Sequence, residues 1–375
     1  MNNMVLKLTS GSRVDPDMVR QLNNLAVRGL AEMFDVEKQL FCFRVKRNDY
    51  GIMKEGFSFR YTIISLLGLH RIKTQGMISP VNIQTALDKL LENTGNIQNI
   101  GDMGLLLWLC ALASPQRLIR IYSELDIKSA LRRYSDARQG RTMELAWFLT
   151  GLSYTALILK DEPAGLADLA ANTYRLLRNN YGGKGIFRHL KRTSFFTGMI
   201  RGQIGSFADQ VYPVYALARF AQAYNSEEAI KMALDCAKTI CRLQGPLGQW
   251  WWHYNSLTGR TVGQYPVYAV HQDGMAPMAL SAIGEVTELD FSESIYKGLE
   301  WITGSNELGY DLIDTSQNII WRSFYRKKYK MYCDEILSLL RFPRGKNSYY
   351  KDINVNFECR PYHLGWILYA FATEQ

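Results

Sequence analysis

The chain has 375 residues, of which 47% are hydrophobic and 21% charged, and its formal net charge is +9. This composition is typical of a globular protein and excludes wholesale disorder. The basic residues are scattered, which is typical of a solvated surface and also suits an anionic substrate or a membrane surface. The sequence contains no nucleic-acid-binding module, so we expect no nucleic-acid partner.

Targeting and cofactor signals are also absent from the sequence. The N-terminal residues hold no apolar stretch long enough for a signal peptide, and no apolar run could span a membrane. The six cysteines form no CxxC pair, and three of them fall on apolar helical stretches. We therefore expect a cytoplasmic protein with free thiols. Nucleotide-binding and zinc-binding motifs are missing, so we expect neither a cofactor nor a metal.

Apolar residues recur with the helical period along most of the chain. A first amphipathic helix is predicted at 16–34, opened by Asp15 and Pro16, and short extended pieces are expected within 35–54. From there, helices that are apolar on nearly every side are predicted at 57–69, 101–113, 142–159, 207–223, 275–283 and 360–373. Amphipathic helices are interspersed with them at 80–94, 115–134, 163–179, 227–242, 291–303 and 328–341.

A helix that is apolar all round is buried, whereas an amphipathic helix lies at the surface. Alternation of the two kinds predicts an all-α fold, an (α/α)6 barrel in which six inner helices form a closed toroid inside an outer layer. A solenoid of helical pairs is the rival, but its repeats would be evenly spaced, and these are not. We expect one domain over residues 1–375, with 1–54 as an outer helix and an irregular extension.

Each inner helix has a carboxylate at or just before its first turn: Glu55, Asp102, Glu144, Asp209, Asp273 and Glu358. Capping of a helix N-terminus alone explains an acid at such a position. In an (α/α)6 barrel, however, all six N-termini meet at one end, and crowded carboxyls in an apolar wall gain raised pKa values suited to general acid catalysis. Asp209 and Asp273 lie in the richest polar and aromatic surroundings, so they are the preferred candidates.

The stretch 244–280 holds three consecutive tryptophans, Trp250, Trp251 and Trp252, followed by His253 and Tyr254. Aromatic walls with a few polar groups are typical of a ligand pocket, although tryptophans in a loop also fill cores. Other polar residues are expected at the same end of the barrel: Arg60, Tyr61, Gln210, Tyr212, His271, Gln272, Glu358, Arg360 and His363. The histidines are also compatible with structural roles, and Arg360 with an ion pair to Glu358.

The six apolar helices, their acidic entrances and the aromatic insert resemble the α/α-toroid proteins of the six-hairpin glycosidase kind. That group includes unsaturated-uronyl hydrolases, some polysaccharide lyases and sugar epimerases. The resemblance is architectural and covers about residues 55–373. It implies a site at the N-terminal ends of the inner helices, with Asp209 and Asp273 as acid and base. It also implies sugar platforms at Trp250, Trp251, Trp252 and Tyr254.

The sequence therefore predicts a carbohydrate-active enzyme of the glycoside hydrolase, lyase or epimerase type, acting on a small molecule or oligosaccharide. Asp273, Asp209 and His271 are its expected catalytic residues. One alternative is a terpenoid cyclase, because QGPLGQWWW faintly resembles the Gln–Trp motif of toroidal cyclases, with Asp273 protonating an isoprenoid. The diphosphate and acid motifs of those enzymes are missing, however. A second alternative is a non-catalytic toroid that binds a glycan or a protein.

Overall fold

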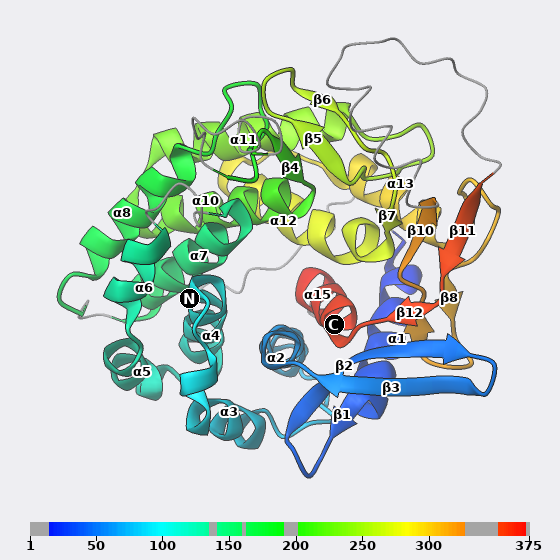
Figure 1. Cartoon of the computed structure of the whole chain (residues 1–375), viewed down its shortest axis with the longest axis horizontal. Coiled ribbons are helices and arrows are strands. Elements are labelled where there is room, and N and C mark those ends of the chain that lie inside the picture. The colour runs from blue at the N-terminus through cyan, green and yellow to red at the C-terminus, as the bar shows by residue number, and fades with distance from the viewer. Residues whose placement is uncertain (1–14, 135–140, 160–162, 191–201, 327–351, 373–375) are drawn as a thin grey trace.

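The computed structural model describes residues 15–134, 141–159, 163–190, 202–326 and 352–372. Six helices in this part of the chain form a closed ring, in which each contacts the next and the last contacts the first (Figure 1). They are α2 (Phe59–Thr74), α4 (Ile100–Ala113), α7 (Thr142–Ile158), α10 (Ala208–Tyr224), α12 (Ala276–Thr287) and α15 (Pro361–Phe371). They match the six apolar helices of the sequence, and the (α/α)6 barrel is confirmed.

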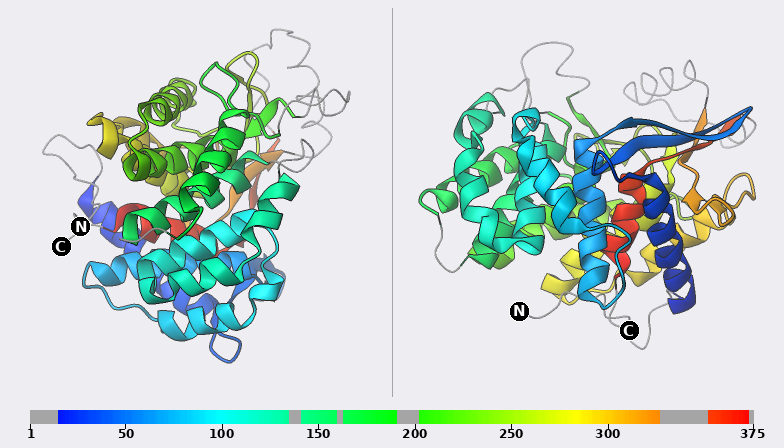
Figure 2. Two further views of the ribbon diagram at one scale, coloured as in Figure 1. Left: turned by 90° about the vertical axis from the view of Figure 1, so that its left-hand side faces the viewer. Right: turned by 90° about the horizontal axis from the view of Figure 1, so that it is seen from below.

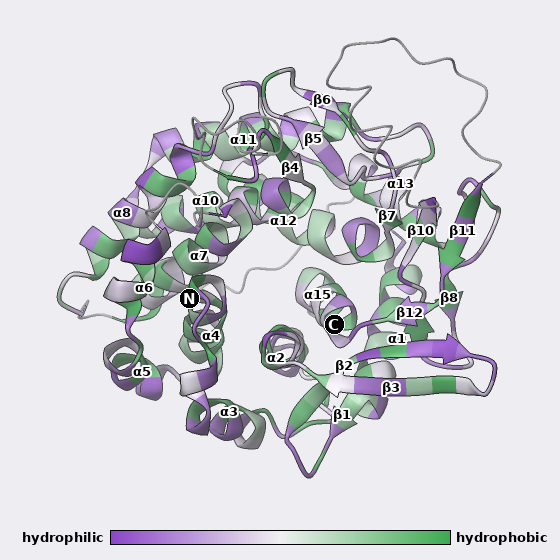
Figure 3. Cartoon of the chain, in the orientation of Figure 1, coloured by the Kyte–Doolittle hydropathy of each residue, from purple (hydrophilic) through white to green (hydrophobic). Residues whose placement is uncertain are grey.

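The outer layer consists of amphipathic helices that turn an apolar face towards the ring (Figure 3). In α3, for example, Ile83, Leu87 and Leu90 are buried while the other face is charged. The layer is formed by α1 (Pro16–Met33) on α15, α3 (Ile83–Glu92) on α2, α5 (Leu118–Glu124) and α6 (Ile127–Tyr134) on α4, α8 (Leu166–Arg178) on α7, α11 (Glu227–Arg242) on α10 and α12, and α13 (Ser292–Ile302) on α12. The helix expected at 328–341 lies outside the described residues.

Neighbouring ring helices approach closely at glycines. A Cβ atom on Gly104 of α4 would lie 2.3 Å from the Cα atom of Phe148 in α7. A Cβ atom on Gly68 of α2 would lie 2.2 Å from the carbonyl oxygen of Gly365 in α15. Only glycine fits such backbone contacts, so these positions set the spacing of the ring.

Short strands join the helices, and the blue N-terminal hairpin lies across one end of the ring (Figure 2). The expected extended segment near the N-terminus is the hairpin of β2 (Leu40–Asn48) and β3 (Gly51–Phe57), which β1 (Phe34–Asp35) and β12 (Glu358–Cys359) extend. Three further small sheets are formed by β4 (Ile204–Ser206), β5 (His253–Asn255) and β6 (Arg260–Thr261), by β7 (Val267–Tyr268), β10 (Ser323–Arg326) and β11 (Ile353–Asn356), and by β8 (Ile313–Asp314) and β9 (Ile319–Ile320).

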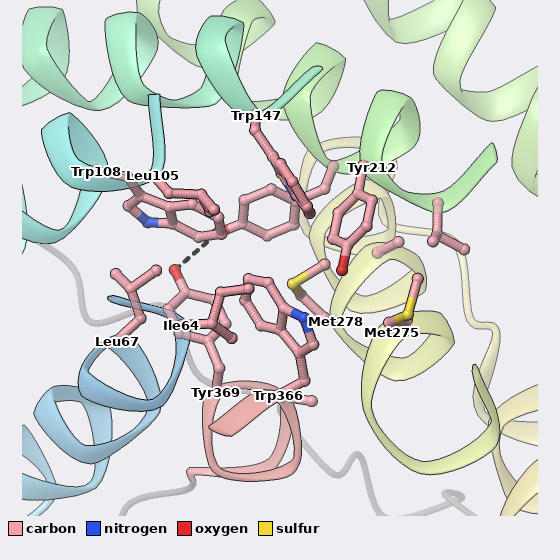
Figure 4. Close-up of a cluster of buried hydrophobic side chains, with 14 of the residues drawn as sticks. Ile64, Leu67, Leu105, Trp108, Trp147, Tyr212, Met275, Met278, Trp366 and Tyr369 are labelled. Carbon is pink, nitrogen blue, oxygen red and sulfur yellow. Dashed lines mark hydrogen bonds between the residues drawn. The ribbon is translucent and has the colours of Figure 1, made fainter. Parts of the chain in front are cut away.

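The centre of the ring is filled with side chains (Figure 4). The Trp108 ring lies 5.5 Å from that of Tyr154, 5.1 Å from that of Tyr215 and 5.7 Å from that of Trp366, centroid to centroid. The hydroxyls of Tyr154, Tyr215 and Tyr369 are hydrogen-bonded in a triangle, at 2.7, 2.7 and 3.1 Å. The ring is therefore a packed core. Of the helices described, none is both long and apolar enough to cross a bilayer.

Candidate functional site

The N-terminal ends of successive ring helices are bonded to one another, which places them at the same end of the ring. We call this end the N-terminal face. Arg60 in the first turn of α2 contacts Asp102 in the first turn of α4. Asn99, the N-cap of α4, donates to Glu144 in the first turn of α7 over 2.8 Å. Acidic and basic groups that are distant in sequence therefore meet here, as expected.

Arg60 and Asp102 form a bidentate ion pair that remains partly exposed. The Nε and Nη2 atoms of Arg60 lie 2.5 and 3.1 Å from the two carboxylate oxygens. The side chains are 31% and 19% exposed, and the guanidinium carbon lies 5.2 Å from the centroid of the Trp147 ring. Burial lowers the pKa of Arg60, but the hydrogen bonds and charge of Asp102 outweigh it and raise that pKa. Arg60 is thus a fixed cation beside an indole.

Glu144 is almost buried, and three side chains contact it: Asn99 and Tyr134 through hydrogen bonds and Arg141 through an ion pair. Its Oε1 atom lies 2.8 Å from Nδ2 of Asn99 and 3.6 Å from Nη1 of Arg141. The Tyr134 hydroxyl is bonded to it as well, and burial together with the charge of Glu144 raises the pKa of Tyr134. These contacts fix the position of the Glu144 carboxyl at the start of α7.

Asp209 is also nearly buried and is surrounded by donors. Its Oδ2 atom lies 2.9 Å from the backbone nitrogen and 2.9 Å from the hydroxyl of Ser206, and 2.9 Å from Nδ1 of His189. Its Oδ1 atom accepts from the backbone N–H of Met143 in the first turn of α7, at 3.2 Å. Asp209 therefore ties the start of α10 to that of α7, which is a capping role across two helices.

Three arginines surround Glu358 in β12. Arg44 and Arg322 lie 2.9 and 3.3 Å from it, and Arg360 is bonded to it as well. Although burial raises the pKa of Glu358, the arginines outweigh this effect and lower it. Arg44 is shared with Glu55 in β3, so three arginines face two carboxylates and leave one positive charge in excess. The expected ion pair of Arg360 with Glu358 is present.

Aromatic rings border this charge cluster. Tyr61 stacks on Phe43 at 5.4 Å and packs against Tyr362 at 4.6 Å, while its hydroxyl lies 2.6 Å from Nη1 of Arg360. Tyr61 and Tyr362 are half-buried. Tyr212 lies deeper, in edge contact with Trp147, and is buried. The partly exposed tyrosines are therefore the rings that a ligand at the N-terminal face would meet.

Asp273 and His363 form a pair that is fully enclosed. His363 Nε2 lies 2.7 and 2.8 Å from the two carboxylate oxygens, and the Asp273 side chain is 0% exposed. Burial raises the pKa of Asp273, against the opposing effect of His363. The pair joins the start of α15 to η3 (His271–Met275), a π-helical turn that precedes α12. The prediction placed Asp273 at the site, whereas the structure places it beneath the surface.

The tryptophan run is divided between the core and the surface. Trp250 and Tyr254 are fully buried and Trp251 nearly so, because these rings pack inside the loop that precedes η3. Only Trp252 is appreciably exposed, and its ring stacks on that of His253 at 4.3 Å. A buried ring cannot stack on a sugar, so a platform role is physically compatible with Trp252 but not with Trp250 or Tyr254.

The remaining predicted residues shape the loops behind the site. The Gln210 side chain accepts a hydrogen bond from the backbone N–H of Phe187 at 2.8 Å and donates one to the carbonyl oxygen of Phe187 at 3.0 Å. Gln272 likewise accepts from the backbone of Trp250 at 3.1 Å and donates to that of Tyr268 at 3.1 Å. Burial lowers the pKa of His271 to about 3, so it stays neutral. These three side chains hold backbone or fill space.

Sequence reasoning missed His189, Asn99, Trp147 and Tyr268, whose ring centroid lies 4.9 Å from the guanidinium carbon of Arg322. Asn99 carried a readable signal, since it stands as an N-cap just before a predicted helix. The others lie in a loop, on a ring helix and in a two-residue strand, where nothing in the local pattern marks them. In the described part of the chain, no cluster of His, Cys, Asp or Glu has the arrangement of a metal site.

No family model matches this sequence, and no curated protein matches it. Solved structures do share its fold. An unsaturated glucuronyl hydrolase from Bacillus sp. GL1 is 12% identical, with a TM-score of 0.57, over 96% of this chain and 98% of the other. The enzyme of that name from Streptococcus agalactiae is 11% identical, with a TM-score of 0.57, over 96% and 92%. The α-1,6-mannanase GH76A of Salegentibacter is 15% identical, with a TM-score of 0.54, over 95% and 98%.

These likenesses extend over nearly the whole of each chain, and they show the fold. The chain has the α/α-toroid fold that these solved structures share. At such low identity the shared fold does not define the chemistry, which has to be inferred from the residues at the N-terminal face.

Proposed function

We propose that the chain is a carbohydrate-active enzyme that cleaves a glycosidic bond of an acidic oligosaccharide at the N-terminal face. The observation that carries this proposal is the meeting of partly exposed arginines, half-buried tyrosines and acceptor carboxylates at one end of a filled toroid. The likeness to glycoside hydrolases of the same architecture supports it.

The arginines favour an acidic sugar. Arg60, Arg322 and Arg360 are all partly exposed, and the cluster around Glu358 has one positive charge in excess. A guanidinium binds a carboxylate through two parallel hydrogen bonds, so Arg322 or Arg360 can exchange part of its contact with Glu358 for a sugar carboxylate. Tyr61, Tyr362 and Trp252 offer faces on which sugar rings stack.

Glu144 is the carboxylate that we assign to the reaction. It accepts a hydrogen bond from Asn99 at the N-terminal face, and its charge acts on Arg60, the partner of Asp102. It would act as the general base that takes a proton from the attacking water. Asp102, whose oxygens are both bonded to Arg60, would position a sugar hydroxyl.

A neutral mannan is a weaker candidate. The inactive variant of the Salegentibacter mannanase, in complex with α-1,6-mannotriose, carries replacements at two consecutive aspartates. This sequence contains no two consecutive aspartates. The glucuronyl hydrolase variant seen with a tetrasaccharide carries a single Asp replacement, which requires no such pair.

The terpenoid cyclase alternative requires a dry cavity within the ring. That space is occupied by Trp108 and Trp366 (Figure 4), and by the hydrogen-bonded tyrosine triangle. We therefore do not favour a cyclase.

The five described cysteines carry free thiols, which supports the expectation of a cytoplasmic protein.

The test is a panel of oligosaccharides ending in a saturated or unsaturated uronate, with neutral manno-oligosaccharides alongside. Product release is followed by chromatography for the wild type, Glu144→Gln and the matched control Glu124→Gln, whose side chain lies on the outer helix α5. We expect turnover of the acidic sugars and a loss of about 10²–10⁴-fold in kcat for Glu144→Gln alone. Binding without turnover would show a non-catalytic toroid, and equal rates in both variants would refute the role of Glu144.

A further inference from the structure

The partly exposed and nearly buried carboxylates at the N-terminal face all accept hydrogen bonds from cations or other donors. Arg60 holds Asp102, Asn99 holds Glu144, and three arginines hold Glu358. Each of these carboxyls is therefore already engaged as a hydrogen-bond acceptor. Cleavage of a glycosidic bond also needs a proton for the leaving oxygen. Burial raises the pKa of Asp273, but this carboxyl has no exposed surface from which to supply the proton.

His189 has the arrangement of a proton donor. Its Nδ1 atom lies 2.9 Å from Oδ2 of Asp209, and the imidazole is 37% exposed while the carboxylate is 1% exposed. The backbone of His189 is fixed as well, because its carbonyl accepts from the N–H of Thr142 at 3.0 Å. Thr142 begins α7, two residues before Glu144, so the imidazole is anchored beside the helix start that carries the proposed base.

The hydrogen bonds to Asp209 indicate which ring nitrogen of His189 carries the hydrogen in the neutral imidazole. The Ser206 backbone N–H and the Met143 backbone N–H also donate to Asp209, so the carboxylate accepts from His189 Nδ1–H. A carboxylate bound at Nδ1 orients the ring, stabilises the imidazolium and leaves Nε2 as the nitrogen that exchanges protons.

We propose that His189 is the proton donor of this site and that Asp209 is its positioning residue. In the step, a water oxygen bonds to the anomeric carbon while one of its protons passes to Glu144. The glycosidic C–O bond breaks, its electron pair stays on the leaving oxygen, and that oxygen takes the Nε2 proton of the His189 imidazolium. The products are the two sugars, neutral His189 and protonated Glu144, and exchange with water restores both groups. This inference rests on the proposed function and changes Asp209 from a reacting group into an orienting one.

The first test needs no substrate. The chain has five histidines, so protein labelled with ¹⁵N-histidine gives few enough ring signals to assign with His189→Gln. We expect neutral His189 to be the Nδ1–H tautomer in the wild type and to move towards Nε2–H in Asp209→Asn. Asp88→Asn, on the outer helix α3, is the matched control and should leave the spectrum unchanged. An Nε2–H tautomer in the wild type would overturn the arrangement.

The second test is kinetic, with an acidic oligosaccharide that the wild type cleaves. We expect His189→Gln to lower kcat about 10²–10⁴-fold with little change in KM, and added imidazole to restore part of the rate to His189→Gly. Asp209→Asn should shift the basic limb of the pH–rate profile to lower pH, since the imidazolium loses its counter-charge. A merely structural Asp209 would lower stability without moving that limb.

The outcomes separate the two proposals. If the wild type cleaves the sugar and His189→Gln is equally fast, His189 is not the donor and the proposed function stands. If the wild type cleaves no oligosaccharide of the panel, the proposed function fails and the proton-donor role fails with it, whatever the tautomer.

Discussion

The contact between α4 and α7 makes a quantitative prediction about the ring. In Gly104→Ala, the new Cβ would lie 2.3 Å from Cα of Phe148, 2.4 Å from the carbonyl oxygen of Trp147 and 2.6 Å from the nitrogen of Phe148. Carbon atoms in contact are normally about 3.5–4.0 Å apart. All three obstructing atoms are backbone, so no side chain can rotate away, and α4 and α7 must separate by roughly 1 Å.

Overpacking of this kind costs about 1–3 kcal/mol, and a rigid backbone obstacle places the cost at the upper end. Replacing a helical glycine by alanine returns about 1 kcal/mol of helix propensity. We therefore expect Gly104→Ala to lose about 2 kcal/mol of unfolding free energy. Activity should fall too, because Asp102 and Glu144 stand on the two helices that move apart.

The assay is urea denaturation followed by circular dichroism, with Gly95→Ala as control. A Cβ on Gly95 meets nothing within 4 Å, so that variant should match the wild type or gain up to about 1 kcal/mol. If Gly104→Ala lies within about 0.5 kcal/mol of the wild type, the glycine contact does not set the ring spacing, and the reasoning is wrong.

Three further predictions concern buried groups. Burial lowers the pKa of His271 from 6.5 to about 3, so below pH 6.5 the unfolded chain binds a proton that the folded chain does not bind. The unfolding free energy of the wild type should therefore fall as pH drops below 6.5, and denaturant titrations of His271→Gln should lack this part of the pH dependence. Burial raises the pKa of Asp273 above 3.8, so the folded chain binds the carboxyl proton more tightly than the unfolded chain does. The unfolding free energy of the wild type, relative to that of Asp273→Asn, should therefore decline as pH rises from 3.8. A difference that does not change with pH would contradict the raised pKa of Asp273. Trp250→Ala should cost about 3–5 kcal/mol in thermal or urea unfolding, whereas Trp252→Ala should cost clearly less and instead weaken oligosaccharide binding.

The candidate site was only partly predictable from sequence, and Asp209 shows why. Its place in a first helical turn marked it correctly as a group at the N-terminal face. That position did not reveal that Met143, Ser206 and His189 would consume its lone pairs. Hydrogen-bond partners from three separate segments decide whether an acid reacts or orients, and no spacing in the sequence encodes them.

The tryptophan run illustrates the same limit for burial. Three adjacent indoles signal a large aromatic surface, but the direction of each ring depends on the path of an irregular loop. Trp250 points into the core and Trp252 towards the surface. A helix or strand would have fixed these directions by its period, whereas a loop has none.

The sequence by itself determined the toroid, because the apolar pattern of each helix indicates whether that helix is buried on all sides or on one side. It also determined that carboxylates would gather at one end, since each stands at the start of a ring helix. Only the tertiary structure decided which acids stay exposed, which are capped or enclosed, and that the ring centre is filled. Those outcomes depend on distances between residues that lie far apart in the chain, such as Asp273 and His363, and a linear pattern holds no such distances.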